Sequence, residues 1–270
     1  MTKTRTAGRV GVRLSLASSC LVVGLCAAGI TAVPALRQQR QRVTVLWFRS
    51  LLWALNVHLE TDGDPVAGGS LQVANHISWL DIIVLGATGS TRFVAKAEIA
   101  RWPLVGSLAK AGDTVFLPRG SHQSGWAAEV VGQRLAKGQS VVVFPEATTT
   151  DGTRTRHFYA RFFAASISSG RPVQPIALQY RVPGGEYMAV PYIDDMSFGQ
   201  SLRALLQQPR IEARVSHQAA IAPEVQDRKS LARAARDSIV IGLAQHNKQS
   251  HNSLVDQASP SDIKANRTAA

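Results

Sequence analysis

The chain has 270 residues, 45% of them apolar and 18% charged, which suffices for a hydrophobic core and excludes a largely disordered protein. Lysine and arginine number 30 against 18 for aspartate and glutamate, so the net charge of +12 favours phosphates, anionic lipid surfaces or an acidic carrier protein as partners. Both cysteines, Cys20 and Cys26, lie near the N-terminus, so the body of the chain excludes a disulfide framework, a zinc–cysteine cluster and a cysteine nucleophile.

The first predicted element is an uncharged apolar segment at residues 14–36, close to the roughly 20 residues that cross a bilayer as a helix. Basic residues flank it on both sides, so the positive-inside rule gives no clear orientation. A helix that spans the membrane and one that dips into a single leaflet are both consistent with this pattern. A third alternative is a signal peptide cleaved after Ala35, although the apolar run is long for one.

The next segment, residues 43–60, contains Trp47, Phe48 and Trp53, aromatic side chains of the kind that rest at a membrane interface. It is either the return of a helix that dips into the membrane or an ordinary amphipathic helix packed on the folded body. We therefore assign residues 1–60 to an N-terminal, membrane-anchoring helical segment.

From residue 61 to residue 245, short β-rich runs alternate with helical ones, a pattern typical of an α/β domain with a largely parallel sheet flanked by helices. The expected strands are residues 70–74, 92–95, 113–117, 140–144 and 173–180. Helices are expected at residues 82–88, 103–111, 125–137, 160–169 and 228–245. Residues 246–270 are polar and lack a core-forming period, so we expect a disordered tail.

The segment VANHISWLDIIVLG, residues 73–86, places Asn75 and His76 after the first expected strand, with Asp81 five residues beyond the histidine. Five positions in an unbroken helix correspond to about 140° around its axis, so the two side chains can meet only if a helix begins between them. The spacing from Ser78 to Asp81 fits such a start, because it is the mark of a capping box. A capping serine and an ordinary strand-end histidine would explain these residues without any catalytic role.

Two further strand ends carry polar residues. Arg119 follows the strand at 113–117, and the sequence PEAT follows the strand at 140–144. The carboxyl ends of parallel strands share one edge of a sheet, where such folds usually bind ligands. Polar clusters at three strand ends therefore favour a functional site that includes His76 and Asp81.

These clusters resemble the sequence blocks of the glycerophospholipid acyltransferases, the family that includes bacterial 1-acyl-glycerol-3-phosphate acyltransferase. Four blocks occur in the family's order: NHxxxxD at residues 75–81, an aromatic-centred strand ending in arginine at 116–119, FPEAT at 144–148, and VxPI at 173–176. The resemblance covers about residues 57–180. It implies an α/β fold and the transfer of a fatty acyl group from a thioester to a lipid hydroxyl.

The resemblance assigns roles to individual residues. His76 is the expected general base on the lysolipid hydroxyl, which attacks the thioester carbonyl directly, and Asp81 is expected to hold the imidazole and stabilise its charged form. Arg119 is expected to face an anionic part of the acceptor, with Lys96 a weaker candidate of the same kind, although each can also be an ordinary surface cation. The other expected substrate-binding residues are Asn75, Glu146, Ala147 and Thr148.

The sequence departs from the family pattern at three positions. Ala147 replaces the third block's glycine, Thr149 stands where many members have arginine, and Asp113 occupies the glycine position of the second block. Because a side chain adds a steric cost at positive φ, we expect the loop at Ala147 to have shifted to a negative φ. Loss of the arginine weakens the case for a phosphate ligand in that loop.

The expected acceptor is 1-acyl-sn-glycerol-3-phosphate, which would give phosphatidic acid, and a lyso-ornithine lipid or another lysolipid is the alternative. Acyl-CoA or acyl-acyl carrier protein is the expected donor, with no cofactor and no metal, and membrane lipids are further partners. We expect the protein at the inner (cytoplasmic) membrane, with its catalytic domain facing the cytoplasm.

Three rival classes are weaker. A catalytically disabled lipid-binding relative is suggested by Ala147, but His76, Asp81 and Glu146 together speak against it. A serine hydrolase is disfavoured because the sequence has no G-x-S-x-G nucleophile elbow. Nucleic-acid binding is disfavoured because the sequence has no recognisable reader motif.

Overall fold

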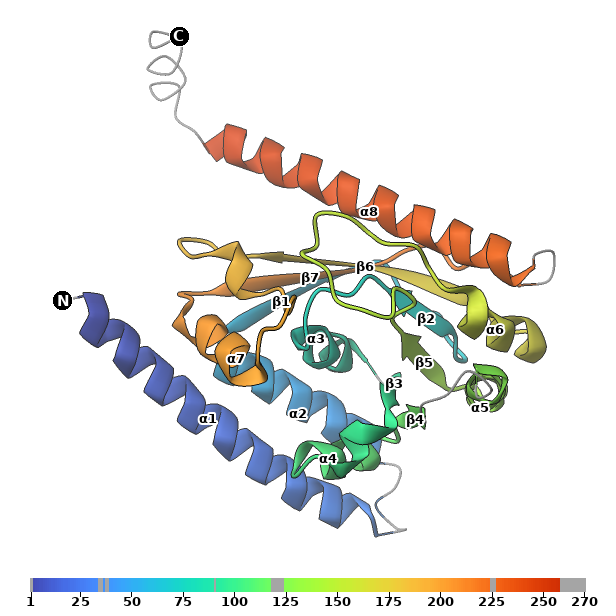
Figure 1. Ribbon diagram of the computed structural model, residues 1–270, viewed down its shortest axis with the longest axis horizontal. Helices are drawn as coiled ribbons and strands as arrows, with labels where there is room; N and C mark the ends of the chain where they lie inside the picture. The colour runs from blue at the N-terminus through green and yellow to red at the C-terminus, as the bar shows by residue number, and fades with distance from the viewer. Residues whose placement is uncertain are drawn as a thin grey trace, which may run out of the picture.

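The computed structural model is an α/β domain in which a seven-stranded sheet lies between two layers of helices (Figure 1). It describes residues 2–33, 36, 39–89, 91–117, 124–223 and 227–257. The strands are β1 (Val57–Asp62), β2 (Leu71–Ala74), β3 (Thr91–Lys96), β4 (Val115–Leu117), β5 (Ser140–Val143), β6 (Val173–Arg181) and β7 (Ile211–His217). The helices are α1 (Thr2–Thr31), α2 (Arg40–Leu55), α3 (Leu80–Thr88), α4 (Val105–Ala111), α5 (Ser124–Ala136), α6 (Phe163–Ser169), α7 (Phe198–Gln207) and α8 (Arg228–Gln257), with short 3₁₀ turns η2 (Ala97–Arg101), η4 (Ala160–Phe162) and η5 (Tyr187–Ala189).

The sheet is largely parallel, as predicted. Its strand order is β1-β7-β6-β2-β5-β3-β4, and within it only β6 and β7 pair in the antiparallel direction. Central strands of such sheets are buried on both faces, which explains why all four residues of β2 are buried. The carboxyl ends of β2, β5, β3 and β4 therefore lie at one edge, where the sequence predicted a site.

Two hydrophobic cores lie on opposite faces of the sheet. On one face, Val131 of α5, Phe163 of α6 and Leu231 of α8 pack together under the long C-terminal helix. On the other face, α2, α3 and α7 cover the sheet, with Leu55 and Leu205 in that core. The site between these layers is held by packing from both sides.

All five predicted strands and the predicted helices are present, but β1, α7 and β7 were not predicted. Asn56 adopts a left-handed conformation with φ of 56° and ends α2, so the sheet already begins at Val57. The last four residues of the predicted helical segment 1–60 therefore belong to β1. At the other end, α8 continues to Gln257, beyond the expected boundary at residue 245, because no proline or glycine interrupts residues 246–257. Residues 258–270 of the expected tail lie outside the described part.

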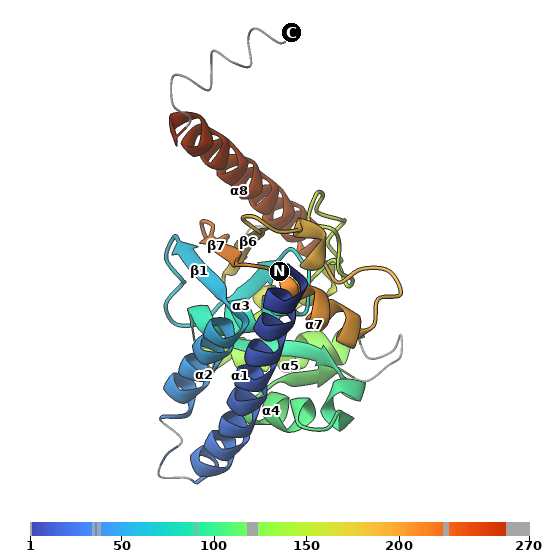
Figure 2. The same ribbon diagram turned by 90° about the vertical axis from the view of Figure 1, so that its left-hand side faces the viewer.

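Helices α1 and α2 form a hairpin that lies along the domain, on the side opposite to α8 (Figures 1 and 2). The indole nitrogen of Trp47 donates to the carbonyl of Cys20 at 2.8 Å and joins the two helices. Near its beginning, α1 is fixed by Arg13, which donates to carbonyl groups just after α7. Near the hairpin tip, Arg40 donates to the carbonyl of Ala111 at 2.7 Å. The hairpin is thus attached to the same body near both of its ends.

Much of the hairpin surface is apolar and exposed. Residues 6–31 are long and apolar enough to cross a membrane by length and composition, and 11% of an 18-residue apolar window within them is buried. Trp53 on α2 is 70% exposed, and Trp102 and Leu104, beside α4, are also exposed. An apolar surface of this kind marks a site of contact with a membrane or another protein.

Candidate active site

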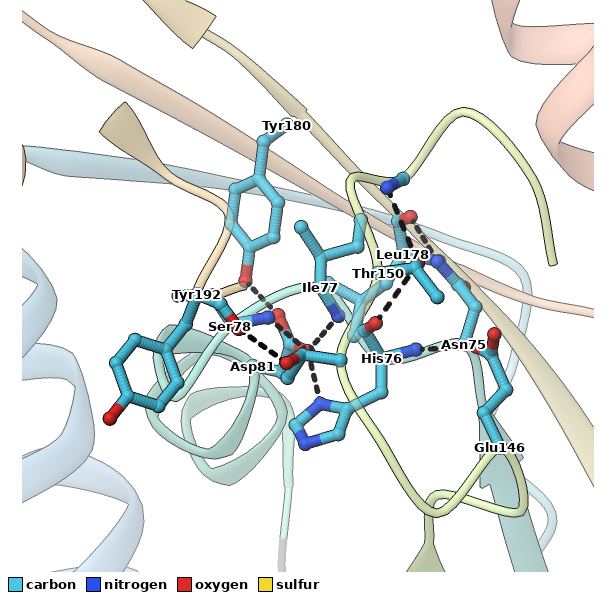
Figure 3. A network of polar contacts seen from close by, with 12 residues as sticks. Asn75, His76, Ile77, Ser78, Asp81, Glu146, Thr150, Leu178, Tyr180 and Tyr192 are labelled. Atoms are coloured by element: carbon cyan, nitrogen blue, oxygen red, sulfur yellow. Dashed lines mark hydrogen bonds and ion pairs between the residues drawn. The ribbon is translucent and has the colours of Figure 1, made fainter. Parts of the chain in front are cut away.

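His76 and Asp81 meet at the end of β2, because α3 begins at Leu80, between them, as the spacing required. The Nδ1 atom of His76 lies 2.7 Å from Oδ2 of Asp81 (Figure 3). Aspartate in the first turn of a helix also suits the positive end of the helix dipole. The sequence therefore builds a histidine–carboxylate pair from a strand end and a helix start.

Asp81 is completely buried and accepts hydrogen bonds on both carboxylate oxygens. Oδ2 also accepts from the backbone N–H groups of Ile77 at 2.7 Å and Ser78 at 3.0 Å, and Oδ1 accepts from the hydroxyl of Tyr180 at 2.7 Å. The capping-box alternative is only half present, because the buried Ser78 hydroxyl makes no hydrogen bond in the described structure. Asp81 thus caps the start of α3 and holds His76 with the same carboxylate.

The His76 ring is oriented for proton abstraction. An ionised carboxylate can only accept, so Nδ1 carries the hydrogen and Nε2 presents a lone pair. Nε2 has no hydrogen-bond partner among the described residues, and the side chain is 18% exposed. The ring of Phe144 stacks on the imidazole at 4.0 Å between centroids and fixes its plane. A histidine held in one tautomer, with its other nitrogen free, is the arrangement of a general base.

The backbone of His76 is held by the third motif block, residues 144–148, and by Thr150 just after it. Oε1 of Glu146 accepts from the N–H of His76 at 2.9 Å, and the N–H of Thr150 donates to the carbonyl of His76 at 2.9 Å. Oε2 of Glu146 accepts from the N–H of Arg156 at 2.7 Å. Burial raises the pKa of Glu146, and these two backbone hydrogen bonds offset part of the increase. Glu146 therefore fastens the histidine to the loop.

The expectation of a negative φ at Ala147 is wrong, because this residue has a φ of 58°. The hydrogen bond from its N–H to the carbonyl of Phe144 and the two bonds of the neighbouring Glu146 fix the turn. The turn keeps the conformation that favours glycine although the residue is alanine. A left-handed alanine is strained by roughly 1 kcal/mol or more.

Ala147 and Thr148 are exposed and line a cavity of about 390 Å³, together with Glu146, Arg156, His157 and Tyr159. The cavity is connected to the histidine through Glu146, which also bonds to the backbone N–H of His76. Thr149, which replaces the family arginine, donates its hydroxyl to the carbonyl of Tyr192 and brings no charge to the loop.

Asn75 has a different position from the one expected of a substrate-binding residue. It is 3% exposed, and its amide both donates to the carbonyl of Leu178 at 2.9 Å and accepts from the N–H of Leu178 at 2.8 Å. Both polar atoms are therefore engaged by β6. The side chain sets the position of β6 beside the end of β2.

The remaining candidates are Lys96 and Arg119. Lys96 is exposed at the end of β3, two strands from β2, with no hydrogen bond or ion pair to His76 or Asp81 in the described structure. Arg119 lies outside the described residues, so its expected contact with the acceptor stays a prediction.

Asp113 also keeps the glycine conformation, with a φ of 60°. Burial alone would raise the pKa of Asp113, but a hydrogen bond from Arg92 and the charge of Arg134 lower it overall. Aspartate tolerates a left-handed backbone better than alanine does, and this side chain forms two ion pairs there.

Sequence reasoning missed Tyr180 and Arg156. The signal for Tyr180 is the difference in strand length. Strand β6 has nine residues and β2 has four, and the two strands pair in parallel from Val173 onward. The longer strand must extend past the edge that carries His76. Arg156 contributes through its backbone N–H, and a motif of side chains cannot predict a backbone hydrogen bond.

Comparisons with known proteins agree with this geometry. The acyltransferase family profile matches residues 55–179. The chain is 35% identical over 243 residues to a lyso-ornithine lipid O-acyltransferase of Pseudomonas aeruginosa, covering 86% of this chain and 94% of that protein. It is 33% identical over 207 residues to a 1-acyl-sn-glycerol-3-phosphate acyltransferase of Neisseria meningitidis, covering 75% of this chain and 81% of that protein.

A solved structure shares the fold. The crystal structure of a 1-acyl-sn-glycerophosphate acyltransferase from Thermotoga maritima superposes with a TM-score of 0.69 at 18% identity, covering 90% of this chain and 98% of that one. This likeness accounts for the sheet and its helical layers. The relatives, the matched profile and the histidine–aspartate pair agree, and the chain belongs to the glycerophospholipid acyltransferase family, whose members acylate lysolipids.

Proposed function

We propose that the chain acylates the hydroxyl of a lyso-ornithine lipid, with His76 as the general base. The observation that carries the chemistry is the His76–Asp81 pair, because it leaves Nε2 open toward a substrate. Nε2 takes the proton of the acceptor hydroxyl while that oxygen bonds to the thioester carbonyl carbon. The carbon–sulfur bond then breaks, and the thiolate leaves with the proton from the imidazolium.

Two observations favour the lyso-ornithine acceptor. The relative from Pseudomonas aeruginosa, named for that acceptor, matches over 94% of its own length. In the loop next to the cavity, Thr149 takes the place of the motif arginine and is bound to the carbonyl of Tyr192. The loop thus lacks the cation that would best complement a terminal phosphate.

The second candidate acceptor is 1-acyl-sn-glycerol-3-phosphate, the acceptor that the sequence predicted. Arg156 lines the cavity beside Ala147, and a guanidinium there can bind a phosphate. Purified full-length protein should be offered both acceptors with a long-chain acyl thioester. A kcat/KM at least 10-fold higher for the lyso-ornithine lipid supports the first assignment, and the reverse ratio supports the second.

We infer that the protein binds one leaflet of the inner membrane through the α1–α2 hairpin, with the catalytic domain on the cytoplasmic side. A helix that crossed the bilayer would have to leave the domain, yet α1 is attached near its start by Arg13 and the hairpin tip by Arg40. The exposed Trp53 and Leu46 of α2 supply apolar contact area. Trp53→Glu should weaken binding to anionic vesicles in a flotation assay, and unchanged binding would contradict the hairpin as the contact surface.

The donor thioester approaches from the α8 side. A groove of about 860 Å³ lies between α8 and the segment 157–160, and Lys229, Arg233 and Arg236 line it. Lys229 and Arg233 form no ion pair with another described residue, and they lie on the layer opposite to the hairpin. Both candidate donors, acyl-CoA and acyl-acyl carrier protein, carry phosphate groups that such cations bind. Arg233→Glu should raise the KM for the donor but not for the lysolipid.

A further inference from the structure

Asp81 receives its hydrogen bonds unevenly. Three donors, Nδ1 of His76 and the N–H groups of Ile77 and Ser78, all bond to Oδ2. Oδ1 has one described donor, the hydroxyl of Tyr180, at 2.7 Å (Figure 3). Asp81 is completely buried and Tyr180 is 3% exposed, so water cannot replace that donor easily.

The position of the hydroxyl is determined by the sheet. Strand β6 pairs with β2 as far as Ile176 and then continues past the end of β2. The two hydrogen bonds between Asn75 and the backbone of Leu178 fix β6 two residues before Tyr180. The rigid neighbouring strand therefore places the phenol against Asp81.

Packing alone does not account for this tyrosine, because phenylalanine fills almost the same space without a polar atom to satisfy. Burial raises the pKa of Tyr180 well above its ordinary value, and the negative charge of Asp81 raises it further. The hydroxyl therefore stays protonated, and remains a donor, throughout the pH range in which a histidine works as a base.

We propose that Tyr180 is a positioning residue for acyl transfer, whose hydroxyl holds the Asp81 carboxylate in place and shares its negative charge. Through Asp81, this hydrogen bond sets both the orientation of His76 and the readiness of His76 to take a proton. The residue touches no substrate in this role.

Other ionisable groups near the pair act differently. Glu146 approaches from the third block and Arg156 from the segment that follows it, but Glu146 accepts from the backbone N–H of His76, and the backbone N–H of Arg156 donates to Glu146. Tyr187 faces Asp81 from η5, and its hydroxyl donates to the carbonyl of Asp151 at 2.7 Å. None of these side chains donates to Asp81 in the described structure. Tyr187 is therefore a matched control for Tyr180.

The test compares Tyr180→Phe with Tyr187→Phe in the full-length enzyme. Without the hydroxyl of Tyr180, the carboxylate of Asp81 loses a hydrogen bond that disperses its negative charge. The carboxylate then stabilises the protonated imidazole of His76 more strongly. The acid limb of the kcat/KM profile should then move to higher pH by roughly 0.5 unit. The kcat should fall by roughly 10-fold with little change in KM, since a hydrogen bond to a charged group is lost. In Tyr187→Phe, the acid limb should stay at the wild-type pH.

A second variant keeps the fold and reverses the sign. Site-specific replacement of Tyr180 by 3-fluorotyrosine retains the hydroxyl and makes it more acidic, hence a stronger donor to Asp81. The acid limb should then move to lower pH, and this measurement decides the question if Tyr180→Phe does not fold. Folded Tyr180 variants with the wild-type profile, or an equal shift in Tyr187→Phe, would overturn the proposal.

Discussion

The two loops that meet at His76 differ in how firmly they are held. In the histidine loop, residues 75–81, Asn75, Ser78 and Asp81 are 3%, 0% and 0% exposed. The acceptor loop, residues 144–150, is anchored by Glu146 and Thr150 but leaves its middle, Ala147 and Thr148, exposed beside the cavity. The proposed base therefore lies on a loop fixed by buried hydrogen bonds, and the proposed substrate contacts lie on a loop whose middle is exposed.

This division has a physical reason. A general base must be held close to its productive geometry, because a small displacement greatly reduces the rate. A pocket that selects a head group gains from side chains that can change without moving the base. The departures at Ala147 and Thr149 both lie in the acceptor loop, while the NHxxxxD block matches the family pattern. Substitutions in the two loops should therefore have unequal effects.

The largest effect is expected from the histidine loop. His76→Ala should lower kcat by roughly 10²–10⁴-fold, because the general base is lost. Thermal unfolding should stay close to wild type, since the ring is partly exposed and its removal leaves the backbone hydrogen bonds in place. Acyl transfer by the purified protein is the measurement.

The matched control is His58→Ala, which removes an exposed histidine from the edge strand β1. It should transfer acyl groups at the wild-type rate. A folded His76→Ala protein that also turns over normally would show that the base is elsewhere.

The second effect concerns the connection between the two loops. Glu146→Gln keeps the size of the side chain but offers an NH₂ group to one of two backbone N–H donors, those of His76 and Arg156. One hydrogen bond to a charged acceptor is lost, so kcat should fall roughly 10- to 100-fold. Glu129→Gln, at an exposed position of α5, is the control and should be neutral. Equal activity of both variants would mean that Glu146 does not hold the histidine.

Glu146 also predicts a pH dependence of stability. Burial raises its pKa in the folded protein, so in the window from about pH 4.3 up to the folded pKa the folded state binds more protons than the unfolded state. This contribution to the free energy of unfolding is present at low pH and is lost as the pH rises through that window. Glu146→Gln should remove this slope in urea denaturation series measured from pH 4 to pH 7.

The sequence predicted the central sheet and the contact between His76 and Asp81 because both follow local rules. Alternating β-rich and helical runs located the strands, and the helix start between His76 and Asp81 followed from their spacing. Strand β7 was missed although a local signal exists, because apolar and polar residues alternate from Ile211 to Val215. Two contacts join residues about a hundred positions apart: the hydrogen bond from Tyr180 to Asp81 and the hydrogen bonds between Asn75 and Leu178. The periodicity of the sequence cannot predict such contacts.

Asp113 and Ala147 stand where the family pattern has glycine. Replacing each by glycine should have smaller effects, of opposite sign, on the free energy of unfolding. Asp113→Gly relieves a left-handed backbone but removes the ion pairs to Arg92 and Arg134, and Arg92 is 12% exposed. We expect the free energy of unfolding to fall by about 1 kcal/mol, after discounting for the partly exposed carboxylate. Its lowered pKa means that the ion pairs stabilise above about pH 4 and are lost as the pH falls through the folded pKa. The loss of unfolding free energy in Asp113→Gly should therefore become smaller at low pH. A loss that does not change with pH would contradict a stabilising role of these ion pairs.

Ala147→Gly should show the smallest effect, because nothing at this position depends on the methyl group. Glycine relieves roughly 1 kcal/mol of strain at a φ of 58°. It also adds about 0.4–1 kcal/mol of freedom to the unfolded chain. The free energy of unfolding should therefore rise by at most about 0.5 kcal/mol, or about 1–2 °C in Tm. The hydrogen bonds of Glu146 and Thr150 to His76 already fix the turn, so kcat should change less than about twofold. If wild-type protein were inactive on every lysolipid and Ala147→Gly restored transfer, the strain in the acceptor loop would reach His76, and the two loops would not be independent.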